Sequence, residues 1–297
     1  MDRNRQIKAD IMLLVVTICW GVSYYLMDLS LEDMDPFTLN AYRFLGAFFI
    51  AALISFKKIR NVNRITMKYA FFVGLALTVV YIGCTFGVKY TTQSNAGFLC
   101  AMTVIFTPIF AFIFNKVIPE KKLFLVLILC LTGIALMTLN EDMHIASGDI
   151  LCLMCAVAYA ADLLITEKGV SHKDVDAYQL GVFQLLFTGL FMLMLSLLFE
   201  EPAVPQSGMT WFAVAFLSII CTGVAFIVQA VAQQYTSSTH VGVIFCLEPV
   251  FAGVVAFFLA GEVLLPRGYV GAGLMLLGLL IMEIDIRQLL KISHKNT

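Results

Sequence analysis

Residues 177–199 read AYQLGVFQLLFTGLFMLMLSLLF, a run of 23 residues that contains no charged side chain. An α-helix rises about 1.5 Å per residue, so this run is long enough to cross the roughly 30 Å hydrocarbon core of a bilayer. In lipid the backbone has to satisfy its own hydrogen bonds, and a single run of this length does so as a helix. The stretch therefore predicts a membrane-spanning helix.

The composition of the whole chain agrees with this prediction. Of its 297 residues, 61% are hydrophobic and only 13% are charged, whereas about a quarter of a soluble domain is charged. The net charge of −1 gives no reason to expect a nucleic-acid partner. These values exclude a secreted protein and a soluble enzyme with one buried core, and they indicate a multi-pass protein whose partner is the lipid bilayer.

Ten apolar runs of spanning length can be drawn along the chain. They are residues 9–27, 36–56, 67–88, 94–114, 122–140, 148–167, 177–199, 209–233, 238–260 and 267–286. When the connections alternate between the two sides, sixteen of the nineteen Lys and Arg residues fall on one side. Basic residues mark the cytoplasmic side, so we expect both termini in the cytoplasm and the protein in the plasma membrane.

The first five runs correspond in order to the last five. Four pairs of matching positions are separated by 139, 141, 145 and 141 residues, namely Asp10 and Asp149, Asp35 and Asp176, Lys89 and Gln234, and Pro108 and Pro249. Because five is odd, the two halves are inverted across the membrane. The sequence thus predicts an all-α integral membrane protein with ten transmembrane helices, arranged as two inverted five-helix repeats (1–143 and 144–297) around a central cavity.

Four segments carry a family resemblance. They are TICWGVSYYL (17–26), YTTQSNAGFLCAMTVIFTPIFA (90–111), CLEPVFAGVVAFFLAGEVL (246–264) and GYVGAGLMLLGLLI (268–281). With them the chain resembles the EamA family of the drug/metabolite transporter superfamily, in the ten-helix form with two EamA units. The resemblance implies a cavity between the halves, lined mainly by spans 1–4 and 6–9. It also implies export of amino acids and other small metabolites.

Three ionisable residues lie inside the predicted spans: Arg43, Asp162 and Glu248. A charge at the centre of a membrane helix costs about 2.5–3.5 kcal/mol, so such residues usually face a cavity or a partner. Arg43 is a candidate clamp for a substrate carboxylate; alternatively it extends to the outer interface or pairs with a carboxylate such as Glu248. Glu248, next to Pro249, is a candidate proton-exchanging group or a helix-packing carboxylate.

Asp162 is a candidate contact for a substrate amino group, and the alternative is a carboxylate that reaches cytoplasmic water. Aromatic and amide side chains inside or near the spans are further candidates for the lining of a small-molecule pocket. They are Trp20, Tyr24, Tyr81, Asn95, Tyr159, Gln184 and Gln229. Ordinary helix packing or anchoring at the membrane interface is the alternative for each of them.

The eight cysteines all fall in apolar runs, so we expect apolar fillers rather than disulfides or a metal site. Gly83 and Gly87 form a G-x-x-x-G motif, which serves either packing within the chain or a homodimer face. No nucleotide-binding motif G-x-x-x-x-G-K-[ST] is present, so we expect no cofactor.

The sequence therefore favours a secondary transporter of amino acids or related zwitterions that works by alternating access, with protons as a candidate coupling ion. The alternatives are export of other amphipathic or cationic molecules, a channel, and an intramembrane enzyme. An enzyme would need a nucleophile with a base, or two facing aspartates. Asp162 has no aspartate partner inside the spans, so we expect no catalysis.

Overall fold

The structure is a computed structural model that describes residues 3–91, 93–138, 147–255, 257–258 and 266–283. Within these ranges the chain forms helices joined by turns and short loops, and it contains no strand. The helices are α1 (Arg3–Leu31), α2 (Pro36–Ile54), α3 (Phe56–Ile59), α4 (Arg64–Tyr90), α5 (Gln93–Ala101), α6 (Thr103–Asn115), α7 (Lys121–Thr138), α8 (Ser147–Val170), α9 (Ala177–Phe199), α10 (Gly208–Ser218), the π-helical turn η1 (Ile219–Val224), α11 (Ala225–Ala232), α12 (Ser238–Phe245), α13 (Glu248–Val255) and α14 (Pro266–Glu283).

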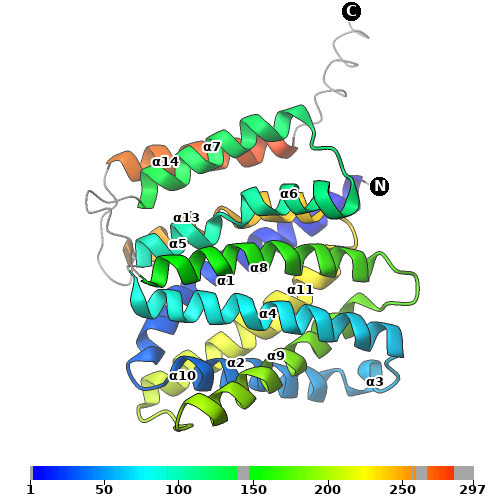
Figure 1. Cartoon of the computed structure of the whole chain (residues 1–297), viewed down its shortest axis with the longest axis vertical. Coiled ribbons are helices and arrows are strands. Elements are labelled where there is room, and N and C mark those ends of the chain that lie inside the picture. The colour runs from blue at the N-terminus through cyan, green and yellow to red at the C-terminus, as the bar shows by residue number, and fades with distance from the viewer. Residues whose placement is uncertain (1–2, 92, 139–146, 256, 259–265, 284–297) are drawn as a thin grey trace, which may run out of the picture.

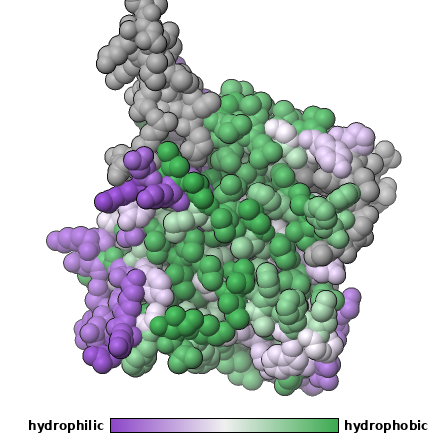
Figure 2. Space-filling model, turned by 180° about the vertical axis from the view of Figure 1, so that it is seen from behind, coloured by the Kyte–Doolittle hydropathy of each residue, from purple (hydrophilic) through white to green (hydrophobic). Residues whose placement is uncertain are grey.

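Seven helical segments of the described chain are long and apolar enough to cross a membrane. Leu99–Asn115 and Pro266–Met282 are shorter apolar helices. Many large apolar side chains point outward; Leu53 is 82% exposed and Phe199 is 71% exposed. Figure 2 shows hydrophobic residues over most of the face in view, with hydrophilic residues gathered mainly along one side. This exterior is suited to lipid rather than to water.

The helices lie side by side in layers (Figure 1). Helix α4 packs along α8 and α9, while α1 packs against α11 and α13. Helices α7 and α14 contact each other at one edge of the molecule, and α2 contacts α9 and α10 at the opposite edge. Because α1, α4 and α8 lie between these edges, the side chains that line the site described below come mostly from the interior of the bundle.

Three of the predicted continuous runs are interrupted in the structure. The run 94–114 is divided between α5 and α6 at Met102, and the run 238–260 is divided between α12 and α13 at Cys246 and Leu247. In the run 209–233 the helix widens to π geometry at η1. Interruptions of this kind inside a membrane protein free backbone groups for other partners, and they occur where the chain lines a cavity.

Glycines let α4 approach its neighbours closely. A Cβ added at Gly83 would lie 2.5 Å from the Leu151 carbonyl oxygen of α8, and one added at Gly74 would lie 2.7 Å from the Phe187 Cβ of α9. A Cβ at Gly87 would meet the Cys152 sulfur of α8. The G-x-x-x-G motif therefore serves packing within the chain, and it is not the face of a homodimer.

The two ends of the bundle differ in charge. At one end lie α3 and the connections from α6 to α7 and from α8 to α9 (Figure 1). Together with the adjoining helix ends, residues 56–68, 116–122 and 167–176 there carry ten lysine and arginine residues and four aspartate and glutamate residues. At the other end, Glu200 accepts hydrogen bonds from the backbone N–H groups of Phe37 (2.9 Å) and Thr38 (2.7 Å). A carboxylate here satisfies free donors at the positive end of α2.

Candidate functional site

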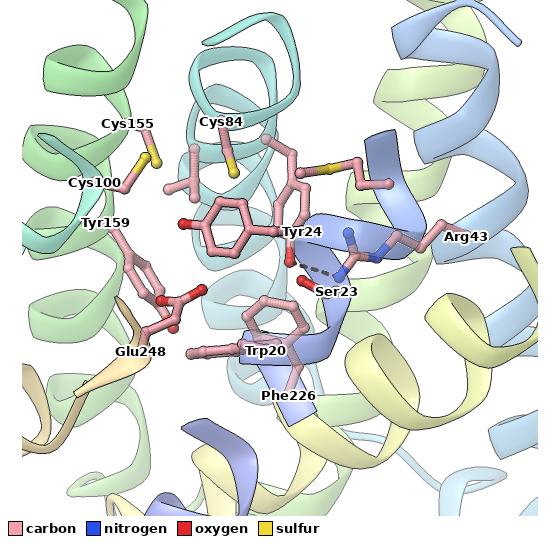
Figure 3. A pocket seen from close by; sticks show the side chains of 13 residues that line it. Trp20, Ser23, Tyr24, Arg43, Cys84, Cys100, Cys155, Tyr159, Phe226 and Glu248 are labelled. Atoms are coloured by element: carbon pink, nitrogen blue, oxygen red, sulfur yellow. Dashed lines mark hydrogen bonds between the residues drawn. The ribbon is translucent and has the colours of Figure 1, made fainter. Parts of the chain in front are cut away.

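A cavity with a water-accessible volume of about 50 Å³ lies inside the bundle. It is enclosed by residues of α1, α2, α4, α5, α8, α11 and α13. The lining side chains are Trp20, Ser23, Tyr24, Met27, Arg43, Val80, Tyr81, Cys84, Cys100, Cys155, Tyr159, Phe226 and Glu248, and Figure 3 shows them from close by. This volume holds only a few water molecules.

Arg43 forms one side of this cavity and is only 1% exposed. Its Nη2 donates to the Tyr81 hydroxyl (3.1 Å) and to the Cys221 carbonyl (3.3 Å), and its Nε donates to the Thr222 hydroxyl. The guanidinium carbon lies 4.7 Å from the centre of the Tyr81 ring. We call Arg43, Tyr81 and the Cys221–Thr222 segment the arginine wall.

The π geometry of η1 explains why Cys221 can accept these hydrogen bonds. In a π turn the backbone N–H bonds to the fifth residue back instead of the fourth, which leaves an α-helical acceptor free. The N–H of Ala225 accordingly donates to the carbonyls of Ile220 and Thr222 and bypasses Cys221. The freed Cys221 carbonyl accepts from Arg43 and from the indole Nε1 of Trp20 (2.8 Å). The wide turn thus positions two of the predicted site residues.

Aromatic rings close the cavity around Trp20. The Trp20 ring centre lies 4.7 Å from Phe245, 5.3 Å from Phe226 and 5.9 Å from Tyr159. Tyr159 stacks on Phe245 at 6.0 Å with an interplanar angle of 5°. Ring contacts of this kind add packing energy beyond the burial of area and hold each ring in one orientation.

Glu248 is the first residue of α13, directly after the break from α12. Its carboxyl group faces the cavity from the side opposite Arg43 (Figure 3) and interacts with the Tyr24 side chain. No ion pair joins Arg43 to Glu248 or to another carboxylate among the described residues. The structure therefore does not contain the predicted Arg43–Glu248 pair, and the two groups stand apart across the cavity.

A chain of side-chain hydrogen bonds leads away from the cavity. The Tyr159 hydroxyl donates to Gln229 (2.9 Å), the Gln229 amide donates to Gln233 (3.3 Å), and Gln233 donates to the Leu163 carbonyl (3.1 Å). Asp162 lies beside the Gln229 amide and is 1% exposed, but neither of its oxygens has a partner with hydrogen-bond geometry among the described residues. Asp162 and Gln229 thus stand behind the cavity lining.

Six of the ten predicted site residues line the cavity. They are Trp20, Tyr24, Arg43, Tyr81, Tyr159 and Glu248. Gln184 is buried and donates to the Phe226 carbonyl (3.2 Å), so it joins α9 to α11 outside the lining. Asn95 belongs to α5, and its side chain lies outside the described part of the structure.

Sequence reasoning missed the three lining cysteines, together with Ser23, Met27, Val80 and Phe226. Cys84, Cys100 and Cys155 come from three helices, and their sulfur atoms all lie within 4.8 Å of one another. We call these three residues the thiol wall. Cys152 and Cys155 stand three residues apart on α8, but only Cys155 faces the cavity, while Cys152 packs beside Gly87.

Comparison with known proteins identifies the family of this chain. Residues 7–139 and 146–284 each match the EamA-like transporter family. The chain belongs to this family. It is thus a membrane transporter of the drug/metabolite transporter superfamily, and the resemblance of its four sequence segments to EamA proteins is confirmed.

Curated relatives of this EamA chain carry transporter names. An "Uncharacterized transporter" of Archaeoglobus fulgidus is 27% identical over 95% of this chain and 88% of its own length. A "Probable amino-acid metabolite efflux pump" of Escherichia coli is 23% identical over 94% of this chain and 96% of its own length. A solved crystal structure superimposes with a TM-score of 0.80 at 15% identity, covering 95% of this chain and 98% of the other, which shows a shared fold.

Proposed function

We propose that this protein is a secondary transporter of zwitterionic small metabolites, amino acids foremost, that works by alternating access. The observation that carries the proposal is the placement of Arg43 and Glu248 on opposite sides of one buried cavity. A substrate carboxylate would bind the guanidinium by charge-assisted hydrogen bonds. The substrate ammonium group would bind the Glu248 carboxylate, and the aromatic rings would enclose the body of the molecule.

The small volume of the cavity also bears on the mechanism. About 50 Å³ accommodates a few water molecules, so a metabolite enters only after the helices around the cavity separate. Separation on one side of the membrane and then on the other is alternating access. Glu248 would carry the coupling proton in this scheme, because it is the one carboxyl group of the described lining.

The helix contacts support the proposal of two inverted five-helix repeats, 1–143 and 144–297, with ten transmembrane helices. Under the repeat, helix α2 corresponds to α9, the α5–α6 span to the α12–α13 span, and α7 to α14, and each packs against its own counterpart. Helix α4 packs on α8, and the corresponding pair, α11 and α1, also packs together. Two separate matches to the EamA-like family, at 7–139 and 146–284, agree with this division.

The charge difference between the two ends of the bundle supports a plasma-membrane orientation with both termini cytoplasmic. Export is the direction we propose, because the Escherichia coli relative is named an efflux pump. The second candidate function is export of cationic amines. The aromatic rings of Trp20, Tyr24 and Tyr159 beside Glu248 favour it, since a cation binds well over aromatic faces. An amine would not need Arg43.

Solute flux in proteoliposomes tests these proposals. The purified protein is assayed for uptake and counterflow of amino acids, amines and aromatic metabolites, first as wild type and then as Arg43→Ala, Asp162→Asn and Glu248→Gln. We expect saturable counterflow of an amino acid that requires Arg43 and Glu248. Flux that does not saturate would indicate a channel, chemical turnover without flux would indicate an enzyme, and amine flux that is unaffected by Arg43→Ala would favour the second candidate. Wild-type flux in all three variants would contradict the assigned site.

A further inference from the structure

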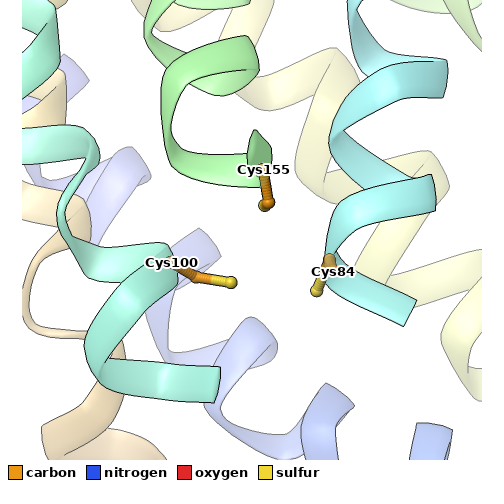
Figure 4. A group of neighbouring side chains, drawn as sticks. All are labelled: Cys84, Cys100 and Cys155. Atoms are coloured by element: carbon orange, nitrogen blue, oxygen red, sulfur yellow. The ribbon is translucent and has the colours of Figure 1, made fainter. Parts of the chain in front are cut away.

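The thiol wall has a geometry that the transport proposal does not use. Cys84 of α4, Cys100 of α5 and Cys155 of α8 point toward one another (Figure 4), and their three sulfur atoms lie within 4.8 Å of one another. All three are free thiols. Sixteen residues separate the first two along the chain and 55 separate the last two, so the convergence is produced by the packing of three helices.

The spacing of the sulfur atoms is close to that of a metal site. Three sulfurs bound to one ion at about 2.3 Å lie roughly 3.7–4.0 Å apart in tetrahedral or trigonal geometry. The observed limit of 4.8 Å leaves shifts of less than about 1 Å to reach these values. Thiolates select soft or borderline ions over Mg²⁺ and Ca²⁺, which prefer oxygen ligands.

The charges around the thiols suit a divalent ion. A divalent ion with three thiolates has a net charge of −1, which is costly in a membrane interior unless it is compensated. Arg43 carries a permanent positive charge across the same cavity and interacts electrostatically with Cys84. Glu248 also lies within electrostatic reach of Cys84. Its carboxyl oxygens are not among the ligand atoms that converge within 4.8 Å of one another, so water in the cavity would supply the fourth ligand.

Access and proton balance are also consistent with binding. Cys84 and Cys100 are partly exposed and Cys155 is buried, so an ion would arrive from the cavity and complete its coordination against α8. On binding, each thiol releases its proton to water in the cavity, and three sulfur–metal bonds form. We propose that Cys84, Cys100 and Cys155 form a binding site for a soft divalent metal ion of the Zn²⁺ class, which ties α4, α5 and α8 together around the transport cavity.

Titration of the reduced, purified full-length protein with Cd²⁺ tests the proposal. We expect a thiolate-to-metal charge-transfer absorption that saturates near one equivalent, together with a higher melting temperature, and no such change with Mg²⁺. Cys84→Ser, Cys100→Ser and Cys155→Ser should each weaken binding at least tenfold. The matched control is Cys130→Ser. The Cys130 sulfur lies 3.4 Å from the Cys246 sulfur, and neither residue lines the cavity.

The result is read independently of transport, because neither absorption nor melting involves a cargo. Unchanged Cd²⁺ affinity in all three cavity variants would overturn the proposal, as would loss of the signal in Cys130→Ser. The melting temperature of each variant is first measured without metal, which shows whether the variant folds. If one serine variant fails to fold, alanine at the same position and serine at the other two positions provide the same test.

Discussion

The arginine wall and the thiol wall of the cavity differ in how their polar groups are stabilised inside the membrane protein. On the arginine wall, a permanent charge is held by hydrogen bonds to Tyr81, Thr222 and the carbonyl of Cys221. On the thiol wall, three weakly polar groups meet without a charged partner among themselves. On the first wall, Nε and Nη2 of the guanidinium donate to acceptors on α4 and η1, which fixes its orientation. The second depends only on how closely α4, α5 and α8 pack, so the two walls should respond differently to substitution.

Arg43→Ala should have the largest effect. It removes the only positive charge of the described lining, and the loss of a charge-assisted pair with a substrate carboxylate should lower amino-acid flux about 100-fold. Initial rates of counterflow measure this effect. Arg60→Ala, at an exposed position directly after α3, is the control and should transport normally. Equal rates in the Arg43 and Arg60 variants would show that the arginine wall does not bind the cargo.

Gly83→Ala should have the next largest effect, on stability. The new Cβ would meet the Leu151 carbonyl at 2.5 Å and the Cys155 nitrogen at 2.8 Å, so α8 must move away from α4 behind the thiol wall. Overpacking of this kind costs about 1–3 kcal/mol, and it should lower the melting temperature in detergent. Gly273→Ala is the matched control, because a Cβ there meets nothing within 4 Å. Similar melting curves for the two variants would contradict the close packing of α4 and α8.

Thr222→Val should have a smaller effect on the arginine wall. Valine keeps the shape of threonine but removes the hydroxyl that accepts from Arg43 Nε. A hydrogen bond to a charged group contributes about 1.5–3 kcal/mol, so we expect at least a tenfold loss of flux. Thr222→Ser keeps an acceptor and should retain most activity. If serine and valine behave alike, the hydroxyl does not orient the guanidinium.

Trp20→Phe should have the smallest effect of the four. It keeps an aromatic ring in contact with Tyr159 and Phe245 but loses the Nε1 hydrogen bond to the Cys221 carbonyl. That carbonyl still accepts from Arg43. The expected cost is therefore about 0.5–1.5 kcal/mol, seen as a modest drop in melting temperature with flux reduced a few-fold. A loss as large as that of Arg43→Ala would mean that Trp20 contacts the cargo directly.

The sequence predicted the family, the helical class and much of the cavity lining. The helical class follows from the hydrophobic runs. The lining follows from charged residues inside those runs, such as Arg43 and Glu248, because a charge is too costly to expose to lipid. The sequence did not predict the thiol wall, because a cysteine in an apolar run carries no pattern that identifies its neighbours. It also placed Gln184 and Asp162 among candidates for the lining, whereas the helix rotations that set them behind it depend on packing between distant segments.

The π turn at η1 has a consequence for how this cavity can change. It contains one residue more than a regular helical stretch of the same hydrogen-bond count. Removing a single residue between 219 and 224 would restore an ordinary helix, and the residues after it would keep their orientation, because the wide turn already absorbs the extra residue. Phe226 and Gln229 would then keep their present neighbours, while Arg43 and Trp20 would lose the free Cys221 carbonyl that they share. A one-residue deletion at this place would therefore release both side chains in one step, while the rest of the bundle stays as it is.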